Sequence, residues 1–227
     1  NYIRSTDETF EANWIALPMT DADGDDVFEV AVPTSVQVHR RLIRYRIEAE
    51  DSAAKTVRVP YADDPALNFA YFVYDGAPAW TGSFKPGREM VTFAADVMNS
   101  LPIYHLIGQE RDLRDSQYTT RYNDGVYRFL GTMVHDGEVY DHMSYRVRGH
   151  GSTYNTGKNK WKLRFNTGHY FKAHDNYGRP RNEAVKTLNF SALASPWNPA
   201  NRGMAGLDEA VAFRLWQLAE TPAANTN

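Results

Sequence analysis

Six basic side chains lie in residues 145–165, and the same stretch contains no acidic residue. Lys and Arg are the side chains that bind phosphate groups, Arg through its planar fork and Lys as a point charge. The whole chain has a net charge of −3, so this basic cluster is a local feature. The chemistry it predicts is the binding of an anion, and phosphate in particular. The six residues are Arg146, Arg148, Lys158, Lys160, Lys162 and Arg164.

Basic and apolar side chains alternate over residues 158–165. Successive side chains of a β-strand point to opposite faces, so this alternation predicts a strand with one charged face and one apolar face. The charged face would carry Lys158, Lys160, Lys162 and Arg164, and the apolar face Trp161, Leu163 and Phe165.

The loop before this strand is rich in small residues, with Gly149, Gly151, Ser152 and Gly157. Glycine tolerates the positive φ angles with which a backbone often approaches a phosphate. Two interpretations remain open. The strand face either binds phosphate, or it is a solvated face whose lysines keep a sheet edge soluble. The lack of acids and the meeting of two basic segments at one loop favour phosphate binding.

Four aspartates in residues 21–26 could supply the clustered oxygen ligands that calcium needs. They are Asp21, Asp23, Asp25 and Asp26. The glycine of this segment occupies the fourth place rather than the sixth, and the glutamate expected at the twelfth place is missing. We therefore favour an Asp-rich turn over a calcium site.

The sequence contains two weaker candidate sites. His169, His174 and Asp175 could hold a metal, but their spacing fits neither a helical His pair nor a zinc motif, so a polar loop is favoured. Ser152 has glycines on both sides in the sequence, as the serine of a nucleophile elbow does. The segment lacks the G-x-S-x-G pattern of hydrolases, however, so we set this possibility aside.

The composition limits the class of protein. A chain of 227 residues can form one large domain or two small ones. Cysteine is absent, which excludes disulfides and thiolate metal sites. No apolar run reaches the length of a membrane helix, and the mild negative charge gives no reason to expect nucleic acid as a partner.

The elements fall into two predicted regions of an α+β chain. Residues 1–83 contain strand patterns at 28–33, 41–51, 55–60 and 68–76, typical of an immunoglobulin-like β-sandwich. Residues 84–227 contain a strand at 100–107, a polar helical or irregular segment at 111–125, and a hairpin at 127–149 around Asp136-Gly137. A short strand follows near residue 188, and residues 206–220 form the clearest helix, with an apolar side of Leu207, Val211, Leu215 and Leu218.

Residues 97–227 resemble the spore-coat-protein-H (CotH) family of kinases. The resemblance rests on the stretch YRVRGHGSTYNTGKNKWKLRF, in which an R-G-x-S-type turn leads into a Lys-rich strand, and on flanking segments such as KTLNFSA and NRGMAGLDEAVAFRLWQLAE. Residues 1–83 are similar to immunoglobulin-like modules that precede such domains in large exported bacterial proteins.

The resemblance implies an atypical protein-kinase-like fold that binds ATP with Mg²⁺ and phosphorylates Ser/Thr of proteins. Arg148, Gly149 and Ser152 match the turn, and Lys158, Lys160 and Lys162 match the strand. Lys160 or Lys162 would hold the phosphates as the kinase strand lysine does. By analogy with kinases, Glu209 would be the ion-pair partner of that lysine.

The same resemblance implies that the catalytic and metal-binding Asp segment lies C-terminal to the helix, outside this chain. We therefore expect the ATP-phosphate-binding half of a CotH-like kinase, in a piece of a larger protein that is exported or displayed on the cell surface. Two alternatives stay open: a non-catalytic adhesion or structural module that keeps the CotH fold, and a module that binds carbohydrate or polyanions.

Overall fold

The fold is seen in a computed structural model that describes residues 2–3, 14–82, 89–118, 127–148, 160–175, 178–191 and 208–223. Strands outnumber helices, and the predicted β-rich α+β class is confirmed. None of the described helices is long and apolar enough to cross a membrane.

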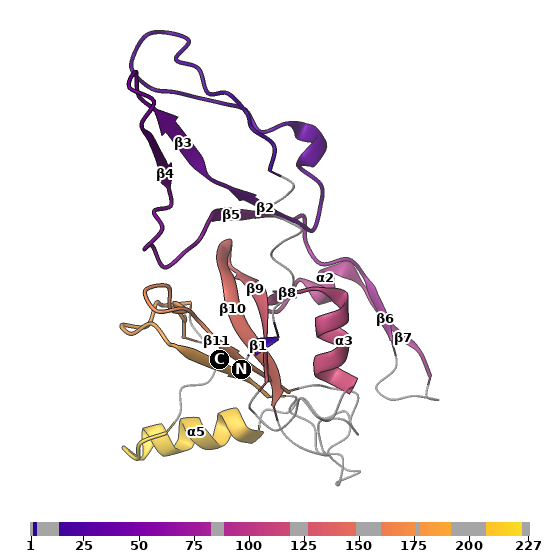
Figure 1. Cartoon of the computed structure of the whole chain (residues 1–227). Helices are drawn as coiled ribbons and strands as arrows, with labels where there is room; N and C mark the ends of the chain where they lie inside the picture. Colours follow the sequence, from indigo (N-terminus) through magenta and orange to yellow (C-terminus); the bar gives the residue numbers. More distant parts are fainter. Residues whose placement is uncertain are drawn as a thin grey trace.

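The main element is a six-stranded sheet in the order β1-β9-β10-β11-β12, with β8 also paired to β9 (Figure 1). All pairs are antiparallel except β1 with β9. The strands are β1 (Tyr2–Ile3), β8 (His105–Ile107), β9 (Arg128–His135), β10 (Glu138–Arg148), β11 (Lys160–Arg164) and β12 (Thr187–Phe190).

The hairpin predicted around Asp136-Gly137 is confirmed. Both residues have positive φ angles, 50° and 77°, which the tight turns of two-residue hairpins require. The β9–β10 register then shifts between Tyr140 and Met143, where β10 contains one more residue than β9. This β-bulge changes which side chains of the two strands face each other along the rest of the hairpin.

One face of the sheet carries the hydrophobic core. Phe129, Tyr145 and Leu163 lie side by side on neighbouring strands and are almost fully buried. The helix α3 (Glu110–Tyr118) lies against β10 (Figure 1). Within the sheet, Gly131 of β9 lies close to its neighbours on β8 and β10, because a Cβ atom there would lie 2.7 Å from the backbone oxygen of Ile107 and 2.8 Å from Cε1 of Tyr145.

The N-terminal strands form two small sheets. β2 (Arg41–Tyr45) pairs with β5 (Phe69–Val73), and β3 (Ile47–Glu50) pairs with β4 (Thr56–Val59). In Figure 1 the β3–β4 pair extends away from the main sheet. The strand predicted at residues 28–33 is absent, and only Glu29 makes a β-bridge, with Thr20.

The predicted immunoglobulin-like sandwich is not confirmed. A sandwich needs two sheets that bury a common core. Among the described residues, all buried hydrophobic side chains lie between Phe129 and Ala173, and strands β3 and β4 are largely exposed. The single strand predicted at residues 41–51 is instead two strands, β2 and β3, which belong to different sheets.

The remaining elements are short, apart from the C-terminal helix. The hairpin of β6 (Trp80–Gly82) and β7 (Val91–Phe93) is followed by α2 (Ala95–Met98), and a 3-10 helix spans Thr34–Val36. The helix predicted at 206–220 is confirmed as α5 (Asp208–Leu218). Its apolar side chains Val211, Leu215 and Leu218 are more than half exposed.

Two buried polar atoms close to α3 have no hydrogen-bond partner within the described part of the chain: the hydroxyl of Tyr145 and Oδ2 of Asp112. Burial raises the pKa of Tyr145, and the charge of Asp112 raises it further. Burial also raises the pKa of Asp112. A buried hydroxyl without a partner destabilises the folded state by roughly 1–3 kcal/mol.

We expect Tyr145→Phe to raise the free energy of unfolding by about 1 kcal/mol, because it removes this hydroxyl and keeps the ring. The matched control is Tyr140→Phe, since the Tyr140 hydroxyl accepts a hydrogen bond from the backbone N–H of Lys172 at 3.1 Å. The control should lower stability by about 1 kcal/mol. Urea denaturation of both variants measures the difference, and a loss of stability in Tyr145→Phe would contradict the expectation.

Candidate anion-binding site

The register of β10 and β11 places two pairs of basic side chains next to each other. Arg146 lies opposite Lys162, and Arg148 lies opposite Lys160. Residues directly opposite in antiparallel strands point to the same face, so these four side chains share one face with Arg164. The strand alternation that the sequence predicts for β11 is present, because Leu163 and Phe165 are buried on the other face.

A third strand adds a basic residue that sequence reasoning missed. β9 pairs with β10 up to Phe129 opposite Tyr145, and one further step along this register places Arg128 opposite Arg146. Arg128 therefore extends the row of Arg146 and Lys162 across three strands. Its distance in the sequence from the basic stretch hid it. The alternation along β9 places Arg128 on the face opposite Phe129, and the bulge in β10 brings Arg146 to that same face. The basic face is defined here as Arg128, Arg146, Arg148, Lys160, Lys162 and Arg164.

Lys162 is at the centre of the basic face and is half-buried. Burial of its ammonium group lowers the pKa of Lys162, and the charges of the four surrounding arginines, Arg146, Arg128, Arg148 and Arg164, lower it further. Each of these effects disfavours the charged form. An anion bound over Lys162 would reverse the electrostatic part of the shift.

Four of the six residues of the basic face have no compensating acid in the described part of the chain. Within the part of the chain that the structure describes, no acidic side chain lies within ion-pair distance of Arg146, Lys160, Lys162 or Arg164. The Nε atom of Arg146 is buried and has no hydrogen-bond partner in that part of the chain. A cluster of like charges without partners is unfavourable unless an anion binds it.

A buried carboxylate of β10, Asp141, is paired with an arginine from the N-terminal region. Asp141 lies in the bulge of β10, and its two oxygens accept hydrogen bonds from Arg44 of β2, from Nε at 2.6 Å and from Nη2 at 2.7 Å. The hydroxyl of Thr132 also donates to Asp141. This bidentate ion pair is a direct connection between the β2–β5 sheet and the main sheet.

The structure describes only some of the binding residues that the sequence predicts. Arg148, Lys160 and Lys162 are brought together, as described above, and their proposed roles stay predictions. Gly149, Ser152 and Lys158 lie outside the described residues. Glu209 is in the first turn of α5, but its side chain lies outside the described part, so its ion pair with a strand lysine also stays a prediction.

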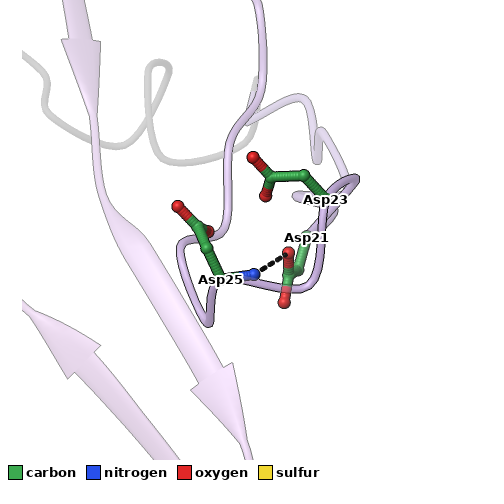
Figure 2. Close-up of side chains that lie close together, drawn as sticks. All are labelled: Asp21, Asp23 and Asp25. Carbon is green, nitrogen blue, oxygen red and sulfur yellow. Dashed lines mark hydrogen bonds between the residues drawn. The ribbon is translucent and has the colours of Figure 1, made fainter.

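The Asp-rich segment forms a turn organised by Asp21 (Figure 2). Its carboxylate accepts hydrogen bonds from the backbone N–H groups of Gly24, Asp25 and Asp26 at 2.7, 3.2 and 3.1 Å. The carboxylates of Asp21, Asp23 and Asp25 also approach to within 4.8 Å of one another. Both oxygens of Asp21 are used by the backbone, so the turn accounts for this residue and we assign no metal.

The candidate metal ligands His169 and Asp175 contact different residues. His169 stacks on Tyr140 and lies 3.4 Å from a carboxylate oxygen of Glu138. Asp175 instead pairs with Arg179 at 2.7 Å. These contacts stabilise the loop locally and do not bring His169 and Asp175 to one centre.

Comparisons with protein-family models, with curated proteins and with solved structures gave no match to this chain.

Proposed function

We propose that this chain contributes the ATP-phosphate-binding part of a CotH-like atypical protein kinase. The observation that supports it is the basic face, a group of cations around Lys162 that includes four without acidic partners among the described residues. The kinase-like character of residues 84–227, the immunoglobulin-like character of residues 1–83 and export to the cell surface belong to the same proposal. They rest on the sequence resemblance.

The residues present fit the phosphates of ATP. Lys162 would contact the phosphate chain as a point charge, and Arg146 and Arg148 would each offer a fork of donors to phosphate oxygens. ATP would supply the transferable phosphoryl group, and Mg²⁺ would neutralise part of its charge. We assign neither a metal ligand nor a catalytic base in this chain, so the proposal covers nucleotide binding and no transfer step.

The nucleoside base is not assigned to the apolar pocket of the main sheet. This pocket has a volume of about 320 Å³, and Trp161, Leu163 and Phe190 are among its lining residues. Trp161 and Leu163 face away from Lys160 and Lys162 along β11. A ligand whose phosphates lie on the basic face therefore cannot place its base in this pocket without crossing the sheet.

We expect Lys162→Ala to weaken the binding of Mg-ATP by about tenfold or more, because it removes a central charge-assisted contact to phosphate. Lys160→Ala should have a smaller effect. Isothermal titration calorimetry at constant ionic strength measures both dissociation constants. The matched control is Lys172→Ala, since Lys172 is exposed and pairs with Glu138 at the opposite end of β10.

Two results would contradict this proposal. If Lys160→Ala and Lys162→Ala both leave the affinity for ATP unchanged, the assignment of the strand lysine is wrong. If the unmodified chain binds no nucleotide, the non-catalytic adhesion module becomes the better interpretation. A salt-dependent affinity for polyanions without nucleotide preference would favour the third alternative.

A further inference from the structure

We infer that Arg128, Arg146 and Lys162 bind a chain of two or more linked phosphates that lies across strands β9, β10 and β11. The inference deepens the proposed function, because it rests on the same basic face. It adds a direction for the phosphate chain, and Arg128 as a binding residue that the resemblance does not include.

The direction follows from the strand register. Arg128, Arg146 and Lys162 occupy matching positions on three adjacent strands. Neighbouring strands of a sheet lie about 4.8 Å apart, so the row presents one cation at each such step, perpendicular to the strands. A linear polyphosphate that follows this row can meet each cation with a different phosphate group. A ligand that followed a single strand would meet only the cations of that strand.

The amount of charge favours a polyphosphate over a single phosphate. One phosphate monoester carries a charge of about −2 at neutral pH. Lys162 alone is surrounded by four arginines whose charges act on it. A di- or triphosphate carries more charge over a greater length, and it can therefore reach Arg146 and Arg128 while it remains on Lys162.

The donors of the row also fit phosphate oxygens. The Nε atom of Arg146 is buried without a hydrogen-bond partner in the described part of the chain, so an acceptor is expected there. Beyond Lys162 the row reaches Asn189 of β12, which lies opposite it. Asn189 carries an amide in place of a charge, so the cationic part of the row ends at Lys162 on this side.

The experiment compares six probes by calorimetry on the full 227-residue chain at constant ionic strength: inorganic triphosphate, pyrophosphate and phosphate, and Mg-ATP, Mg-ADP and Mg-AMP. We expect the affinity to rise from phosphate through pyrophosphate to triphosphate, by about tenfold at each step. Arg128→Ala and Arg146→Ala should each weaken triphosphate binding by about tenfold and phosphate binding much less.

The controls separate binding from folding. Arg58→Ala removes an exposed arginine of β4, outside the main sheet, and should leave every affinity unchanged. Arg146→Lys keeps the charge but loses the fork, and it should bind triphosphate more strongly than Arg146→Ala and less strongly than the unmodified chain. Thermal unfolding of each variant checks that the fold is retained. If Arg146→Ala does not fold, the affinity of Arg146→Lys for triphosphate is compared with that of the unmodified chain instead.

The outcomes distinguish this inference from the proposed function. Triphosphate binding that is no stronger than phosphate binding would overturn the inference. ATP binding that is unaffected in Arg128→Ala and Arg146→Lys would overturn the inference and leave the proposed function standing. Triphosphate binding that depends on the row, without any binding of ATP, would support the inference and contradict the proposed function.

Discussion

Asp141→Ala is expected to lower the free energy of unfolding by about 3 kcal/mol or more. The substitution leaves the Arg44 guanidinium without its bidentate partner, although the Arg44 side chain is only 26% exposed. It also removes the acceptor of the Thr132 hydroxyl. A half-buried cation that loses its anion keeps its desolvation cost and loses the compensating attraction. Urea denaturation, followed by tryptophan fluorescence, measures the loss.

The matched control is an ion pair on the surface. Arg179 is 72% exposed and pairs with Asp175. Arg179→Ala should therefore cost less than about 1 kcal/mol. The double variant Arg44→Ala/Asp141→Ala should be less destabilised than the sum of the two single variants, because removal of both partners leaves no buried charge. If Asp141→Ala costs no more than Arg179→Ala, the connection between the two regions is not supported.

The same ion pair predicts a pH dependence. Burial acts to raise the pKa of Asp141, but the hydrogen bond from Arg44, the charges of His142 and Arg44, and the Thr132 hydroxyl together hold it below its ordinary value of 3.8. A carboxyl group whose pKa is lowered by folding stabilises the protein above its unfolded pKa, and this contribution is lost as the pH falls through the folded pKa. The stability difference between the wild-type chain and Asp141→Asn should thus be constant above about pH 5 and shrink below pH 3.8.

Phe165→Ala is expected to destabilise the chain by about 3–5 kcal/mol. Phe165 is 2% exposed, and its ring stacks on Phe171 and meets the edge of Tyr140, with centroid distances of 5.5 and 5.1 Å. Removing the ring leaves a cavity at the end of β11, where the surrounding rings can collapse only in part. The change in the free energy of unfolding from urea denaturation tests this value.

The adjacent residue supplies the control for Phe165→Ala. Arg164 is exposed and lies on the basic face. Arg164→Ala should therefore change stability by about 0.5 kcal/mol or less. The substitution also removes a positive charge that repels Lys162, and this relief opposes any loss of stability. Equal costs for the two substitutions would mean that residues 164 and 165 do not point to opposite faces.

Local patterns predicted the elements of the main sheet more successfully than their arrangement. The Asp136-Gly137 turn, the alternation along β11 and the helix α5 each depend on interactions between near neighbours, and each is present. The sandwich predicted for residues 1–83 is not confirmed, and local patterns could not decide it, because pairing among strands depends on contacts distant in the sequence. The side of α5 that carries Val211 and Leu215 is apolar as predicted, yet exposed.

The sequence by itself determined that basic and apolar side chains alternate along β11, since a period of two follows from strand geometry alone. It therefore placed Lys160 and Lys162 on one face. Only the tertiary structure decided that Arg128 joins them. A hairpin that continued without the bulge between Tyr140 and Met143 would place Tyr145 opposite Arg128, on the face away from the core. The extra residue in β10 shifts the register by one position, so that Tyr145 packs beside Phe129 in the core and Arg146 lies beside Arg128 on the other face.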